Sequence, residues 1–163
     1  MSKNILNICI NSDTWQTEDK FNEWQNTLSK VLDATIKTMD LKNCEVNLLL
    51  TDNDEIQQLN CDFRNIDAPT NVLSFPQYEA LEEFVPDPNN MCIGDIAIAY
   101  ETVKSEAIEF NKPFFDRCTH LFVHGTLHLL GLDHVEVDER TEMERIETEI
   151  LAQFNIKDPY IRD

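Results

Sequence analysis

Residues 120–134, HLFVHGTLHLLGLDH, contain all four histidines of the chain, and a glycine among them marks the end of a predicted helix. The helix is expected over residues 113–130. Pro113 suits its first turn, and Gly131 can adopt the left-handed conformation that terminates a helix and turns the chain back. A random scatter would spread four histidines along the whole chain, so their clustering on both sides of one turn demands a common explanation.

The spacing of these histidines is typical of a metal site. His124 and His128 lie one turn apart on the same helix face, and the glycine turn can bring His134 back to meet them. Three neutral imidazoles with an open fourth position describe a catalytic zinc site, in which the pKa of bound water is lowered to roughly 7. Ordinary surface or core histidines are the alternative. His120, one turn before His124, is open between a partner of the ligands, a substrate contact and a packed core residue.

The same pattern invites comparison with the zinc-peptidase motif HExxHxxGxxH. Gly125 stands where those peptidases have the glutamate that serves as general base. Without that carboxylate, a peptidase lacks the group that deprotonates zinc-bound water. A peptidase-like metallohydrolase is therefore an alternative hypothesis and not the first one.

Around this segment, the hydrophobic periodicity predicts four strands and five helices. The strands are expected at residues 4–10, 45–50, 71–75 and 94–99, with a loop over residues 77–91. The helices are expected at residues 20–39, 52–62, 100–110, 113–130 and 138–154. These elements predict one α+β domain over residues 1–163. Its mixed sheet of about four strands is covered by helices, and the zinc site lies on the C-terminal helical part.

The charge balance limits the classes of partner. The 163 residues include 13 Lys and Arg against 31 Asp and Glu, a formal net charge of -18. Proteins that coat DNA or an anionic membrane need a basic surface, so neither is an expected partner. Five scattered cysteines without a CxxC pair predict reduced thiols. The first residues do not resemble a signal peptide, and the expected location is cytoplasmic.

Much of the acidity lies in residues 131–150, which contain eight Asp and Glu against two Arg. The helix in this segment is expected to turn its carboxylates, Glu147 among them, to solvent. A docking surface for basic ribosomal proteins is the alternative interpretation. Asp133, beside His134, is open between orienting an imidazole and capping the turn.

The run HGTLHLLGLDH at residues 124–134 closely resembles the HGxLHLxGxDH signature of the YbeY family, the metal-dependent endoribonucleases and ribosomal RNA maturation factors of bacteria and organelles. Further matching blocks are Phe63-Arg64, residues 67–76 (DAPTNVLSFP), residues 94–96 (GDI) and residues 158–160 (DPY). The resemblance extends over about residues 45–163. One departure is Leu132, where an aromatic residue is common in the family.

This resemblance implies a zinc-dependent endoribonuclease that is specific for single strands and acts in maturation of the 3′ end of small-subunit (16S) ribosomal RNA. It implies that His124, His128 and His134 bind one Zn²⁺, and that Arg64 and His124 are catalytic. A guanidinium can fork onto two phosphate oxygens as negative charge develops, although Arg64 can also pair with a nearby aspartate on the surface. Expected partners are single-stranded or ribosomal RNA and the ribosome or its proteins.

If the protein is an endoribonuclease, unpaired RNA is expected to enter a groove between the strand at residues 71–75 and the histidine helix. The second hypothesis for the function is a non-catalytic ribosome-assembly factor. In that case zinc only holds the C-terminal helices, since structural zinc binding is coupled to folding.

Overall fold

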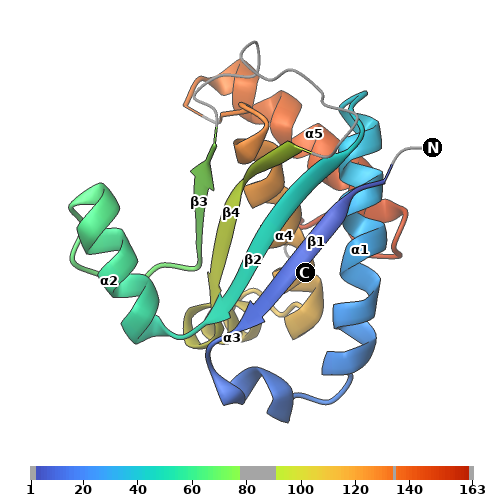
Figure 1. Cartoon of the computed structure of the whole chain (residues 1–163). Helices are drawn as coiled ribbons and strands as arrows, with labels where there is room; N and C mark the ends of the chain where they lie inside the picture. Colours follow the sequence, from blue (N-terminus) through green and yellow to red (C-terminus); the bar gives the residue numbers. More distant parts are fainter. Residues whose placement is uncertain (1–2, 78–90, 134, 162–163) are drawn as a thin grey trace.

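A four-stranded mixed sheet organises the chain, as the computed structural model shows for residues 3–77, 91–133 and 135–161 (Figure 1). The order across the sheet is β1 (Ile5–Ile10), β2 (Cys44–Thr51), β4 (Met91–Ala99) and β3 (Val72–Pro76). β1 and β4 both run parallel to β2, whereas β3 runs antiparallel to β4. The predicted strands are confirmed. β4 begins earlier than expected, and residues 78–90 of the predicted loop lie outside the described residues.

The described residues contain five α-helices, as the sequence predicts, of which α1 and α2 connect strands and the other three follow the last strand. They are α1 (Phe21–Thr38), α2 (Asn53–Arg64), α3 (Tyr100–Glu109), α4 (Phe114–Leu129) and α5 (Val137–Ala152), and a 3-10 turn, η1 (Asp13–Thr17), precedes α1. Asp52, where the sequence predicts this helix to start, caps α2 by accepting a hydrogen bond from the backbone N–H of Glu55 at 2.9 Å, as aspartates at this position commonly do. Within the described residues, no helix is long and apolar enough to cross a membrane.

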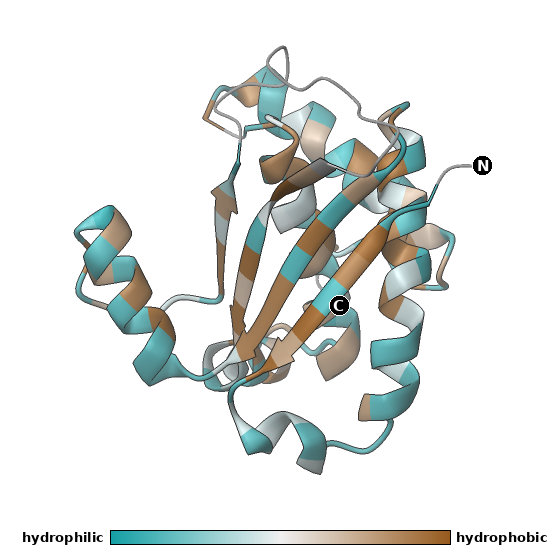
Figure 2. Ribbon diagram, in the orientation of Figure 1, coloured by the Kyte–Doolittle hydropathy of each residue, from teal (hydrophilic) through white to brown (hydrophobic). Residues whose placement is uncertain are grey.

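The two faces of the sheet are covered differently. On the back face, alternate strand residues such as Leu48 and Ile96 pack into the main core with α1, α4 and α5. On the front face, turned toward the viewer in Figure 1, α2 covers only one part through a small cluster of Ile56, Leu73, Ala97 and Ala99. Hydrophobic and hydrophilic residues alternate along β1 and β2 (Figure 2), because successive strand side chains point to opposite faces. The α+β prediction is confirmed.

Near the start of β4, Gly94 allows a close contact between the sheet and the end of α4. Gly94 has a φ of +146°, and the strand register shifts beside it, between Glu45 and Val46 of β2. A Cβ at this position would lie 2.4 Å from the carbonyl oxygen of Phe75 and 2.7 Å from Cδ2 of Leu129. Only a residue without a side chain lets the end of α4 approach the β3–β4 pair this closely.

Candidate metal centre

Helix α4 positions the predicted histidines. It lies against β3 and β4, with Gly125 close to Ser74 and Ile96, so it is buried on most sides. His120, His124 and His128 follow one another at intervals of four residues along the helix. The imidazole rings of His124 and His128 meet, with ring centroids 4.5 Å apart and the two Nε2 atoms separated by 3.0 Å. The structure therefore brings these two predicted ligands together.

The other nitrogen of each ring is fixed by an acceptor. Nδ1 of His124 lies 3.2 Å from a carboxylate oxygen of Glu147, and Nδ1 of His128 lies 2.9 Å from the carbonyl oxygen of Leu132. Carboxylate and carbonyl oxygens only accept, so both Nδ1 atoms carry protons. In the neutral rings, both Nε2 atoms then present lone pairs to each other, an arrangement that a cation stabilises.

Glu147 organises this centre from α5. Its side chain is fully buried. One carboxylate oxygen accepts hydrogen bonds from Nε2 of His120 and from the hydroxyl of Tyr160, both at 2.6 Å, and the other faces His124. Burial alone would raise the pKa of Glu147, but the hydrogen bonds from His120 and His124 outweigh it and lower the pKa to about 2. The carboxylate is thus ionised and accepts from three side chains.

His120 contacts the residues that hold the centre in place. Its two ring nitrogens point to Arg117 and Glu147 and not to the His124–His128 pair. Arg117 can only donate, so its contact at 3.1 Å makes Nδ1 of His120 an acceptor and places the ring proton on Nε2, toward Glu147. Burial lowers the pKa of His120, despite the opposing hydrogen bond to Glu147. Arg117 is itself held by Glu106 at 2.9 Å. Of the three roles open for His120, the geometry favours a partner of the ligands.

The donor chemistry of this centre fits zinc. Two imidazole nitrogens bound to one tetrahedral zinc at about 2.0–2.1 Å lie about 3.3–3.4 Å apart, which is close to the separation of 3.0 Å between the two Nε2 atoms. Second partners that fix the Nδ1–H of each ring are a regular feature of zinc-binding histidines. Within the described residues, no group of three His, Cys, Asp or Glu side chains forms a metal site. His134, the third predicted ligand, lies outside them.

The glycine turn before His134 has the predicted backbone. Gly131 has a φ of +97°, in the region that lets the chain leave the helix. Its N–H bonds to the carbonyl oxygen of His128 at 3.0 Å, and the next N–H, of Leu132, bonds to that of Leu127 at 3.0 Å. The turn therefore places the Leu132 carbonyl where it can accept from His128. Asp133 is exposed, and its role stays open.

Arg64 lies apart from the histidines. It is the last residue of α2, on the front side of the sheet, and its side chain is exposed. Among the described residues it forms no ion pair with Asp62 or Asp67. Those carboxylates instead accept hydrogen bonds from Gln58 and Gln57. No hydrogen bond or ion pair among the described residues links Arg64 to His124 or His128.

The predicted groove between residues 71–75 and the histidine helix is wrong. Ser74 donates a hydrogen bond to the carbonyl oxygen of Gly125 at 3.1 Å, and a Cβ on Gly125 would already be tight against that hydroxyl. The strand and helix are packed directly together. The centre opens on its other side, where a cavity of about 280 Å³ borders His124. Its remaining lining residues are Arg140, Met143, Glu144, Glu147 and Tyr160.

The prediction for Glu147 is wrong, because its carboxylate was expected in solvent and lies fully buried in this centre. A signal was present. Met143, Ile146, Ile150 and Leu151 form the buried stripe of α5, and Glu147 falls on that stripe, one turn from Met143 and from Ile150–Leu151. A carboxylate on an apolar stripe is buried only with partners. Those partners, His120 and Tyr160, lie far away in the sequence.

Comparison with known proteins assigns this chain to a class of RNA-cleaving enzymes. Residues 9–155 match the family described as "Endoribonuclease YbeY". A Sinorhizobium fredii protein named endoribonuclease YbeY is 40% identical over 163 aligned positions, covering 95% of this chain and 91% of that protein. A Rhodopseudomonas palustris protein of the same name is 44% identical, covering 94% of this chain and 79% of the relative.

A solved structure agrees. The solution structure of a Thermotoga maritima protein superposes with a TM-score of 0.60 at 26% identity, covering 93% of this chain and 92% of that one. The chain belongs to the YbeY endoribonuclease family.

Proposed function

We propose that this protein is a zinc-dependent endoribonuclease that cleaves unpaired RNA and acts in maturation of the 3′ end of small-subunit (16S) ribosomal RNA. The observation that carries the metal dependence is the pair of Nε2 atoms of His124 and His128, which face each other at 3.0 Å while both Nδ1 atoms are held by acceptors. Membership of the YbeY family supports RNA as the substrate. His134 is the proposed third ligand.

A zinc ion in such a centre acts as a Lewis acid and lowers the pKa of bound water. The residues of the chain supply everything else. Glu147 and the Leu132 carbonyl hold the two rings in the tautomer that places a lone pair on each Nε2. Arg140 lines the same cavity as His124, and Arg64 is exposed at the end of α2. We assign both guanidinium groups to RNA phosphates, which they can bind through paired hydrogen bonds.

The open cavity favours catalysis over a purely structural zinc. A structural site is closed by four protein ligands. The His124 side chain, by contrast, is 20% exposed and borders a cavity large enough for a phosphate group. Gly125, which stands where the zinc peptidases have their glutamate, has no side chain and is packed against Ser74 and Ile96. The peptidase base is therefore missing from its usual position.

The test combines elemental analysis with RNA cleavage. The purified protein should contain about one zinc ion per chain and cleave unpaired RNA. Chelation should abolish cleavage, and added zinc should restore it. His128→Ala should lose both zinc and cleavage while circular dichroism shows a folded protein. Arg145→Gln is the matched surface control, since Arg145 is exposed and paired with Glu142 and Glu149.

Each alternative has its own outcome in this experiment. An unfolded His128→Ala variant would support the assembly factor with a structural zinc. Faster turnover of a peptide library than of RNA would support a peptidase-like hydrolase. Undiminished RNA cleavage by the metal-free protein would contradict the proposal.

The cellular part of the proposal concerns ribosomes in the cytoplasm. All five cysteines are free thiols, which suits a reducing compartment. Ribosomal RNA or ribosomal proteins are the proposed partners that present the substrate, because a net charge of -18 opposes tight binding of free RNA. Cells depleted of the protein should accumulate small-subunit RNA with an unprocessed 3′ end. Normal 3′ ends in such cells would contradict this role.

A further inference from the structure

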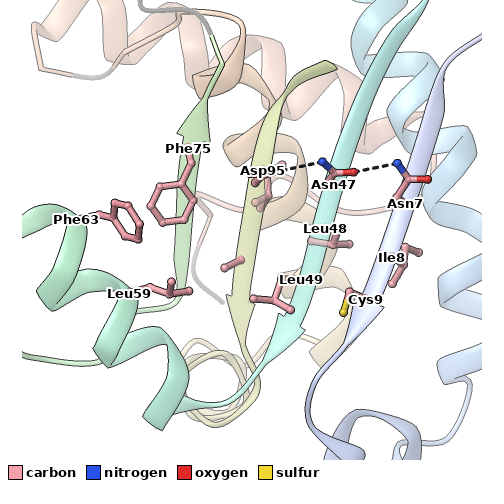
Figure 3. A pocket seen from close by; sticks show the side chains of 12 residues that line it. Asn7, Ile8, Cys9, Asn47, Leu48, Leu49, Leu59, Phe63, Phe75 and Asp95 are labelled. Carbon is pink, nitrogen blue, oxygen red and sulfur yellow. Dashed lines mark hydrogen bonds between the residues drawn. The ribbon is translucent and has the colours of Figure 1, made fainter. Parts of the chain in front are cut away.

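A groove of about 550 Å³ lies on the front face of the sheet (Figure 3), whereas the helix with the histidines, α4, packs on the back face. We call it the front groove. The side chains that the argument uses are Asn47, Leu49, Leu59, Phe63, Phe75 and Asp95, which come from α2 and from three strands. The volume is in the range of sites for small organic molecules, which combine apolar walls with a few polar groups.

A row of polar side chains crosses the strands at one end of the front groove. Asn7, Asn47 and Asp95 are neighbours in the strand register. Asn7 donates to Asn47 at 2.9 Å, and Asn47 donates to Oδ1 of Asp95 at 2.8 Å (Figure 3). Among the described residues, Oδ2 of Asp95 has no hydrogen-bond partner. The row thus holds a carboxylate in place with one oxygen available to accept.

Two aromatic rings stand beside this carboxylate. Phe75 is the register partner of Asp95 on β3, so the two side chains are neighbours on the same face. Phe63 reaches over from α2 and meets Phe75 edge to face, with centroids 5.4 Å apart. The Phe63 side chain is 68% exposed, which is unusual for a large apolar residue. A flat ring that packs on Phe63 and Phe75 would reach Asp95 with its edge.

We propose that the front groove binds one unpaired nucleobase of the RNA substrate, a base that carries an exocyclic amino group, and this inference rests on the proposed function. Bases in single strands stack on aromatic side chains and are read by hydrogen bonds at their edges. Cytosine, adenine and guanine can each donate an amino N–H to Asp95. Uracil presents carbonyl oxygens on both sides of its one N–H, and these repel a carboxylate. The negative charge of Asp95 also excludes a phosphate from the groove.

The position of the groove allows a single-stranded RNA bound there to continue to the histidines. β3 lies at the edge of the sheet, so the RNA can pass around it from the front face to the back face. Gly94 lies beside both the Phe75 backbone and the side chain of Leu129, the neighbour of His128, so the end of the groove and the end of α4 approach the same residue. Arg64 follows Phe63 directly in the chain and can bind a phosphate outside the groove.

Fluorescence anisotropy with six-nucleotide oligocytidine, oligoadenosine and oligouridine tests this proposal. The zinc-loaded protein is used, and anisotropy is read directly after mixing, before gels show cleavage of the RNA. The wild type should bind oligocytidine and oligoadenosine about 10-fold more tightly than oligouridine, from one discriminating base contact. Phe63→Ala should weaken binding of all three by roughly 5- to 100-fold through lost stacking.

Two further variants separate base recognition from charge. Asp95→Asn keeps an oxygen that accepts from Asn47 but loses the carboxylate, so the preference against oligouridine should fall toward equal affinity. Glu45→Gln is the matched control. Glu45 lies on the same face and accepts from Asn7, and it does not line the front groove, so its variant should shift all three affinities alike and keep their ratio. Melting temperatures should show that all variants are folded, since these side chains are not in the core.

Wild-type affinity of Phe63→Ala for all three RNAs would overturn the proposal, and it is the result expected if the groove takes an apolar side chain of a protein partner. An unchanged preference in Asp95→Asn would overturn the base selectivity. Failure of the proposed function gives a different result. The wild type would then not cleave RNA, while the binding preference and the Phe63 effect persist.

Discussion

The two faces of the sheet differ in the burial and hydrogen bonding of their carboxylates. On the back face, Glu147 is fully buried and its oxygens are used by His120, His124 and Tyr160. On the front face, Asp95 is exposed and one of its oxygens has no hydrogen-bond partner among the described residues. The buried carboxylate holds two imidazoles and a hydroxyl in place, whereas the exposed one can accept a further hydrogen bond. The proposals above assign catalysis to the back face and base recognition to the front face, so variants on the two faces should have different effects.

The largest effect is expected for Glu147→Ala. It removes a buried acceptor from three donors, and breaking a buried charged network costs about 3–5 kcal/mol. Urea unfolding should show this loss. Glu147→Gln keeps the shape and should remain folded, but zinc affinity should fall roughly 10- to 100-fold, as for other residues that orient metal ligands. Unchanged stability and zinc affinity in both variants would show that the back face does not depend on this carboxylate.

Gly94→Ala tests the close contact between the β3–β4 pair and the end of α4. The new Cβ would collide with the Phe75 carbonyl and Leu129, and a φ of +146° is unfavourable for alanine. We expect a loss of about 2–4 kcal/mol in the free energy of unfolding, from strain and overpacking together. Gly125→Ala is the comparison, because its closest contact is 3.1 Å and its helical backbone suits alanine. Equal effects at both glycines would contradict the special role of Gly94.

Arg140→Gln should affect substrate binding more than folding. Arg140 is exposed and lines the cavity beside His124, so loss of one phosphate contact should raise KM for RNA about 3- to 10-fold, the effect of one charge-assisted hydrogen bond at the surface. Arg145→Gln, on the same helix but held by two glutamates, should leave KM near the wild-type value. Steady-state cleavage at constant ionic strength provides the comparison. Equal KM changes in both variants would indicate a general charge effect.

The smallest effect is expected in the reactivity of the thiols at pH 8. Cys9 is exposed on the front face, whereas Cys44 and Cys118 are fully buried. Burial raises the pKa of Cys44 to about 11 and also raises the pKa of Cys118. Because the thiolate is the reactive form, both should remain unmodified while Cys9 is alkylated within minutes. Reactivity of Cys44 should appear only as the pH approaches 11 or the protein unfolds, and Cys118 should react only on unfolding. Mass spectrometry of peptides gives the order of modification.

Most elements were predictable from the sequence, because local signals determine them. The start of α2 at Asp52 and the glycine turn at Gly131 each depend on residues within a few positions, and both are found as predicted. The strand order was not predictable. The insertion of β4 between β2 and β3 depends on pairing across more than 40 residues, which no local pattern encodes. For the same reason the uncovered part of the front face had no sequence signal.

The centre was predictable in part. The spacing of His124 and His128 indicated their meeting, which the structure confirms. Their assignment as metal ligands, with His134, stays a prediction, as does the catalytic role of Arg64. The expected RNA groove beside Ser74 was wrong, because sequence spacing gives no measure of how closely a glycine lets a helix approach a strand. Glu147 was misplaced because its neighbours in the chain are acidic residues that do face solvent, such as Glu149.

Burial of Glu147 also separates two responses to dissolved salt. Ions screen exposed charges over about 8 Å at physiological ionic strength, whereas a buried pair is screened much less. The repulsion between RNA and the many exposed carboxylates of the chain therefore weakens as salt is added. The hydrogen bond between Glu147 and the imidazole of His124 is buried and does not weaken in the same way. Added salt can therefore reduce the repulsion of RNA without disturbing the geometry of the proposed catalytic centre.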